Sequence, residues 1–228
     1  MSNADELSSW LAGLPPDWTA GCSSAAFEHA RVAYESPPRP YHNWHHVEAC
    51  VALLASFACD HPRTVFLALI FHDAIYVAGR KDNEARSAEF ARTVLERERC
   101  VSGDELDAID RMIRATHDHS AHAGTNERDL AVMLDIDLSI LGAPRDDYAR
   151  YARAIHDEYV PAATTDAHFR IGRLEFLERT LGSQSLFITA EASQRWDARA
   201  RANIAWEIDQ LKSERGVVER PVTALDRQ

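Results

Sequence analysis

Positive charge is what this sequence lacks most. Its 228 residues include 25 lysines and arginines against 36 aspartates and glutamates, which gives a formal net charge of −11 at pH 7. A negative field of this size repels phosphate backbones, so we expect no nucleic-acid polymer as a partner. A small anionic substrate is compatible with the sequence only where a local cation or a bound metal overrides that field.

Long apolar segments are also missing. No apolar run approaches the roughly 20 residues that a bilayer-spanning helix needs, so we expect no membrane partner. The first residues, MSNADELSSWLAGL, lack the basic start and the long apolar region of a signal peptide. The four cysteines show no CxxC spacing. Together these features lead us to expect a reduced, cytoplasmic protein.

Strand patterns and flexible linkers are absent as well. The chain shows no useful alternation of apolar and polar residues, no internal repeat, and no stretch rich enough in Gly, Ser or Pro to separate domains. Apolar residues instead recur at helical spacing along most of the chain. We therefore predict an all-α protein: one helical bundle over residues 1–228, with a core over about 18–211 and a frayed tail after 216.

The most informative stretch runs from Phe66 to Tyr76, FLALIFHDAIY. A helix that is apolar on all sides belongs in the middle of a core. His72 and Asp73 follow the apolar run directly, and a buried charge without a partner is costly, so both side chains need partners there. A bound metal ion would satisfy both. On these two residues alone, a buried His–Asp hydrogen bond without metal explains the pattern equally well.

Three histidines cluster in the segment YHNWHHV at 41–47. His42 and His46 are four residues apart, so they share a face if the following helix extends back to His42. His46 also lies on the apolar line that continues through Cys50, whereas His45 is rotated away from it. Taken alone, His46 is better explained as a hydrogen-bonded core residue than as a metal ligand.

The segment LDIDL at 134–138 contains two aspartates, and helical periodicity predicts which of them points into the core. Asp137 falls within the stripe formed by Leu134, Leu138 and Leu141, whereas Asp135 falls toward a less apolar edge. We therefore predict that Asp137 points into the core and Asp135 more nearly out of it. A carboxylate in a core requires a cation, and both a metal ion and an arginine meet that need.

These sites supply two imidazoles and two carboxylates that face the core. Such a set suits a divalent transition metal, and ligands from separate helices are a common way to build a metal site in a bundle. The predicted ligands are His46, His72, Asp73 and Asp137.

The order His, His-Asp, Asp on a helical background resembles the HD-domain metal-dependent phosphohydrolases. The segment at 41–46 is also similar to the YHNxxH signature of cyclic nucleotide phosphodiesterases, which share this type of metal site. Most of the chain resembles a group of bacterial proteins described as predicted HD-superfamily phosphohydrolases. The matching segments are YHN at 41–43, FHDAIY at 71–76, DNEARSA at 82–88, LDIDLSILG at 134–142 and ARAN at 200–203.

The resemblance implies a phosphohydrolase for a small phosphomonoester or phosphodiester, with nucleotides among the candidates. It implies His42 as the general acid, Asp73 as a ligand that also takes part in catalysis, and metal-activated water as the nucleophile. HD proteins with two metals usually carry extra histidines after the HD pair, and none occurs here between Asp73 and Thr116. We therefore expect one divalent ion, which would be Mn, Mg, Fe, Co, Ni or Zn.

Four further residues are expected near the substrate or a second ion: Lys81, Asn83, Glu84 and His119. His117 and His122 are expected to be solvated loop residues. A homodimer is compatible with the sequence.

Two other classes of function fit parts of this pattern. One is an HD-type di-iron oxygenase resembling myo-inositol oxygenase, which needs six ligands and is disfavoured by the missing histidines. The other is a non-catalytic module in which a metal stabilises a site for a nucleotide or a partner helix. A histidine beyond the ligand set, His42, favours catalysis over this module.

Overall fold

The computed structural model describes residues 3–35, 37, 39–160 and 162–218. Over these residues the chain forms α-helices and 3-10 helices and no strand, which confirms the predicted all-α class. The α-helices are α1 (Asn3–Ala12), α2 (Pro16–Thr19), α3 (Ser24–Glu35), α4 (Trp44–Leu54), α5 (Pro62–Phe71), α6 (Asn83–Arg97), α7 (Gly103–Ala115), α8 (Arg128–Asp137), α9 (Arg145–Tyr159), α10 (Asp166–Leu181) and α11 (Ala190–Val218). The 3-10 helices are η1 (His119–His122) and η2 (Leu138–Gly142). None of the helices described is long and apolar enough to cross a bilayer.

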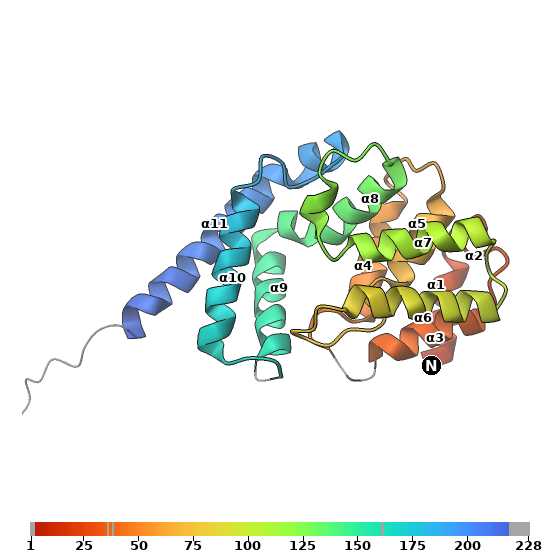
Figure 1. Cartoon of the computed structure of the whole chain (residues 1–228), viewed down its shortest axis with the longest axis horizontal. Coiled ribbons are helices and arrows are strands. Elements are labelled where there is room, and N and C mark those ends of the chain that lie inside the picture. Colours follow the sequence, from red (N-terminus) through yellow and green to blue (C-terminus); the bar gives the residue numbers. More distant parts are fainter. Residues whose placement is uncertain (1–2, 36, 38, 161, 219–228) are drawn as a thin grey trace, which may run out of the picture.

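The helices form two groups joined at α8 (Figure 1). Helices α1 to α7 fill one end of the molecule, and α9, α10 and α11 lie together at the other. Helix α8 packs against α4, α5 and α7, while η2, which continues α8, packs against α9 and α11. The end of α8 therefore lies where the two groups meet.

Helix α5 lies at the centre of the larger group. It packs against α2, α4, α7 and α8, and every residue from Val65 to Phe71 is fully buried. Pro62 opens its first turn, where a missing N–H costs nothing. The apolar run therefore occupies the middle of the core, as predicted, and delivers His72 to its end.

The start of α5 is tied to α8 by a buried carboxylate. Asp129 accepts hydrogen bonds from the backbone N–H groups of Asp60 and His61, at 2.7 and 2.8 Å. These groups lie just before α5, where a helix entry leaves N–H groups without helical partners. Hydrogen bonds to a charged group contribute about 1.5–3 kcal/mol each, so Asp129 fixes α5 against α8.

The smaller helix group is held by a buried ion pair. Arg173 of α10 donates to Glu207 of α11 at 2.8 Å, and the hydroxyl of Tyr148 in α9 donates to the same carboxylate at 2.5 Å. All three side chains are buried. One carboxylate thus joins the three helices of this group.

The packed part of the chain begins earlier than expected. Leu7 of α1 is only 1% exposed and belongs to the hydrophobic core, which therefore includes residues before position 18. At the other end α11 stays helical to Val218, two residues beyond Gly216, where we expected the tail to begin. The rest of the predicted tail, residues 219–228, lies outside the described residues.

Gly142 allows the two helix groups to meet closely. A Cβ at this position would lie 2.5 Å from the Cβ of Trp196 in α11 and 3.0 Å from its Cα. We expect Gly142→Ala to lower the free energy of unfolding by about 1–3 kcal/mol, because α11 must move away from η2. Urea unfolding measures this change.

Gly172 provides the matched control. It lies inside α10, and a Cβ there would meet no described atom within 4 Å. Gly172→Ala should therefore raise the free energy of unfolding by about 0.5–1 kcal/mol through its helix propensity. Equal effects of the two substitutions would show that η2 and α11 do not need this close approach.

Candidate metal site

Four side chains meet at the end of α5. His46 comes from α4, His72 and Asp73 follow α5, and Asp137 is the last residue of α8. Each offers one ligand atom, and these atoms all lie within 4.8 Å of one another. The structure thus brings together the four side chains that the sequence predicted, and the group could hold a metal ion.

The spacing of these atoms matches what one ion requires. Nε2 of His72 lies 3.0 Å from Oδ2 of Asp73 and 3.2 Å from Nε2 of His46. Nε2 of His46 is also 3.1 Å from Oδ1 of Asp137. Two ligand atoms bound about 2.1 Å from one ion lie about 3.0–3.4 Å apart when they are neighbours in an octahedron or tetrahedron.

The hydrogen bond of His72 favours a metal-binding tautomer. Its Nδ1 lies 2.8 Å from the carbonyl oxygen of Leu69, which can only accept, so Nδ1 carries a proton. Nε2 of neutral His72 then offers a lone pair toward the carboxylates of Asp73 and Asp137. Only a cation or a second proton satisfies this arrangement, and metal-bound histidines commonly donate their other N–H to a carbonyl in this way.

The charges of the group stabilise one another. Burial opposes ionisation of Asp73, but the nearby His72 and His42 outweigh it and lower its pKa to about 2. Burial likewise opposes ionisation of Asp137, yet His72 and hydrogen bonds from His119 and His46 hold its pKa well below the ordinary value. Both carboxylates therefore stay ionised near neutral pH and favour a cation between them.

The same interactions act on His72 in the opposite direction. Burial lowers its pKa, but the charges of Asp73 and Asp137 outweigh burial and raise the pKa well above the ordinary 6.5. A divalent ion that binds Nε2 takes the place of this proton, so metal binding should release protons.

Arg39, which was not among the residues predicted from the sequence, fixes the backbone around the metal group. This buried arginine donates to the carbonyl oxygens of Asp73 and Ala74 at 2.6 and 2.8 Å. It also donates to the carbonyl oxygens of His42 and Ala33 at 2.9 and 2.6 Å. One side chain thus joins the segment before α4 to the segment after α5. In the sequence, the only indication of this role was that an arginine stands next to prolines in a short connection.

His42 lies before helix α4 and not within it. Asn43 is the N-cap, its side chain accepting from the N–H of His45, so the helix begins at Trp44 and the condition that it extend back to His42 is not met. The His42 ring nevertheless lies near the group, with its centroid 6.2 Å from that of His46. It stacks on Tyr76 at a centroid distance of 4.0 Å.

Glu158 of α9 holds His42 in place. Its Oε2 lies 2.5 Å from Nδ1 of His42, and its Oε1 accepts from the backbone N–H of His42 at 3.2 Å. Glu158 is buried, and its partner lies 116 residues away, so no local pattern in the sequence indicated this contact.

Asp135 is buried, so the prediction that it points outward was wrong. It is 1% exposed, and its carboxylate accepts from the backbone N–H groups of Ile188 and Thr189 at 2.6 and 2.7 Å. Burial raises the pKa of Asp135, while these hydrogen bonds oppose that rise. The apolar stripe of α8 faces α5, and the segment that leads into α11 covers another face of α8. Helical periodicity could not reveal that this second face, which carries Asp135, is also buried.

The other predicted residues divide into two sets. His119 reaches the group, because its Nε2 lies 3.0 Å from Oδ2 of Asp137. Glu84 pairs instead with the exposed His117, at 3.2 Å. Asn83 is buried, and its side-chain amide bonds both backbone groups of Val77, so it supports the loop after Asp73.

Two lesser expectations concern the surface. Lys81 is exposed, and none of the contacts described ties it to the metal group. His117 is exposed, as expected, whereas His122 is partly buried at the end of η1. All four cysteines are free thiols.

No protein-family model matches this chain, and no curated protein matches it either. The geometry of the site is therefore the main guide to function.

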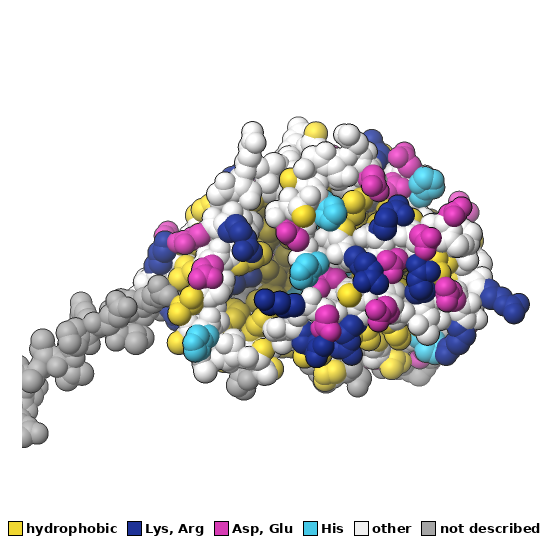
Figure 2. All heavy atoms as spheres, in the orientation of Figure 1, with side chains coloured by type: hydrophobic (Ala, Val, Ile, Leu, Met, Phe, Trp, Pro, Cys, Tyr) yellow, Lys and Arg dark blue, Asp and Glu magenta, His cyan; other side chains and the backbone are white. Residues whose placement is uncertain are grey.

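A pocket opens beside the metal group. It has a volume of about 700 Å³, and His119, Leu138 and Arg179 are among the residues that line it. Figure 2 shows a hollow in this face of the molecule, with hydrophobic side chains on its floor. Small-molecule sites typically occupy about 300–1,000 Å³, so the pocket is large enough for a substrate.

The two aspartates of α8 should respond differently to substitution. Asp137→Ala should lose bound metal, because it removes one of four ligands. Asp135→Ala should keep most of the metal but lower the free energy of unfolding by about 1–3 kcal/mol, because two backbone N–H groups lose their acceptor. Metal analysis after dialysis and urea unfolding measure the two effects. Equal metal loss in both folded variants would contradict this assignment.

Proposed function

We propose that this chain is an HD-type metal-dependent phosphohydrolase that cleaves a small phosphomonoester or phosphodiester, with nucleotides among the candidates. One observation carries the proposal. A histidine that is not needed as a ligand, His42, lies beside the ligand group and is held there by Glu158. A histidine in this position can donate a proton to a departing oxygen.

Mixed nitrogen and carboxylate ligands suit a divalent ion, which we propose to be Mn, Mg, Fe, Co, Ni or Zn. When bound, such an ion lowers the pKa of water and offsets charge on the phosphoryl group. His46, His72, Asp73 and Asp137 would hold it. Asp73 faces His72 through Oδ2, and its second oxygen can accept a hydrogen bond from the attacking water.

His42 and Glu158 supply the proton for the departing group. Glu158 occupies Nδ1 of His42, so Nε2 is the nitrogen that can donate to the leaving oxygen. Stacking on Tyr76 limits rotation of the ring. The pair therefore forms an acid whose ring is held in one orientation near His46.

A screen with the metal-loaded protein tests this proposal. We expect phosphate release, or release of an alcohol from a diester, with at least one member of a panel of nucleotides, sugar phosphates and phosphodiesters. EDTA should abolish turnover, and adding back a divalent ion should restore it.

The other two classes of function predict different results in the same screen. Absence of turnover from protein with verified metal would favour a non-catalytic binding module. Two irons per chain with oxygen consumption would favour an oxygenase. Either result overturns the hydrolase proposal.

His42→Gln tests the role of the acid. It should keep the metal content and slow the hydrolysis of esters with poor leaving groups by about 10²–10⁴-fold. A nitrophenyl phosphate, whose leaving group needs little protonation, should be slowed far less. Steady-state kinetics on the two substrates compares them.

His45→Gln is the control for this experiment. His45 lies in the same turn of the chain, but its side chain is 91% exposed, so both substrates should be hydrolysed normally. Equal slowing of both substrates by His42→Gln would remove His42 from the role of acid.

A further inference from the structure

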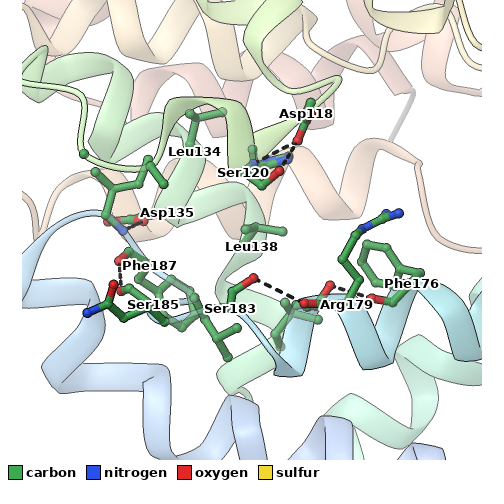
Figure 3. A pocket seen from close by; sticks show the side chains of 18 of the residues that line it. Asp118, Ser120, Leu134, Asp135, Leu138, Phe176, Arg179, Ser183, Ser185 and Phe187 are labelled. Carbon is green, nitrogen blue, oxygen red and sulfur yellow. Dashed lines mark hydrogen bonds between the residues drawn. The ribbon is translucent and has the colours of Figure 1, made fainter.

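The pocket beside the metal group has a mixed lining. Leu138, Phe176, Leu186 and Phe187 form apolar walls, and Ser120, Thr180 and Ser183 contribute hydroxyl groups at other positions. Such a lining suits an organic body that has both apolar faces and hydroxyl groups. Figure 3 shows these side chains arriving from three directions: from the loop with Ser120, from α8 with η2, and from α10 with the segment that follows it.

The pocket and the metal group share a boundary. His119 lines the pocket, and its Nε2 lies 3.0 Å from Oδ2 of the proposed ligand Asp137. Leu138, the next residue in the chain, also lines the pocket. A molecule with one end at the metal group would therefore extend past His119 into this pocket.

A single arginine lines the pocket. Arg179 of α10 lines it and lies near Asp118: the hydrogen bond from Ser120 lowers the pKa of Asp118, and the charge of Arg179 adds to this lowering. In Figure 3 its side chain extends from α10 toward the side where Asp118 and Ser120 lie. Asp118 already accepts from the hydroxyl of Ser120 at 2.6 Å and from two backbone N–H groups.

The positive charge of Arg179 matters in this pocket because the chain has a net charge of −11. Such a chain repels anions, so binding one in this pocket requires a local cation. The planar guanidinium offers paired donors that match phosphate and carboxylate groups. Arg179 is the arginine that lines this pocket.

We propose that the pocket binds the organic body of the substrate and that Arg179 binds a second anionic group there. The substrate class is then a phosphoester on a hydroxylated body of about nucleoside size that carries a phosphate or carboxylate away from the scissile bond. This inference rests on the proposed phosphohydrolase function only for the identity of the group at the metal.

Matched ligands with one and two anionic groups test the proposal. The probes are a nucleoside 5′-monophosphate and the corresponding 3′,5′-bisphosphate, titrated into metal-loaded protein by calorimetry and compared in kinetics. The bisphosphate should bind about tenfold more tightly or better, the effect of one charge-assisted contact in a partly open site. A phosphorylated sugar acid compared with the neutral sugar phosphate tests carboxylate in the same way.

Substitutions at Arg179 locate the effect. Arg179→Gln should remove the preference for the second anion, and Arg179→Glu should reverse it, with metal content unchanged. The side chain is exposed on α10, so both variants should fold. Arg199→Gln, an exposed arginine of α11 that does not line the pocket, should keep the preference.

The outcomes separate this inference from the proposed function. Turnover without any preference for the second anion, or a preference that survives Arg179→Gln, overturns the role of the pocket and leaves the hydrolase proposal standing. Binding of the bisphosphate that depends on Arg179, without turnover of any ester, overturns the hydrolase proposal and leaves the pocket as a binding site.

Discussion

Two carboxylates and two imidazoles meet at the end of a helix that is buried along its whole apolar run, where little water can solvate them. Charged groups in such a place are tolerated only when every charge has a partner. The carboxylates of Asp73 and Asp137 face Nε2 of His72, whose other nitrogen is already bound to a carbonyl oxygen. The surrounding structure serves to hold these atoms at the separation that one cation can satisfy.

Helix α8 does much of this positioning with three acidic side chains. Asp129 binds the backbone before α5, and Asp135 binds the backbone before α11. Asp137, at the end of the same helix, turns to the metal group. The two structural aspartates set the position of α8 against both helix groups, so the third arrives at a fixed point between them. Helix α8, through its three carboxylates, thus connects the packing of the two helix groups with the position of Asp137 in the metal group.

Arg39 and Glu158 position His42, the proposed acid, as these aspartates position α8. Arg39 ties the segment of His42 to the segment of Asp73 through carbonyl oxygens, and Glu158 binds both the ring and the backbone of His42. Both side chains are buried, so their hydrogen bonds act in a medium where water competes little. Glu158 belongs to the smaller helix group and His42 to the larger. The proposed acid therefore depends on the two groups being packed together, as does the pocket, whose walls come from both.

The sequence by itself determined the helical class, the central place of the apolar run at α5, and the residue types that could meet a metal. These features follow from local rules, because helical periodicity and the cost of burying a charge are properties of a short segment. It did not determine the environment of Asp135 or the partners Arg39 and Glu158. Those depend on which distant segment covers each face: Asp135 meets residues 53 and 54 positions away, and Glu158 meets His42 across 116. Only tertiary packing chooses such neighbours, since a periodic pattern records that a face is buried and not what buries it.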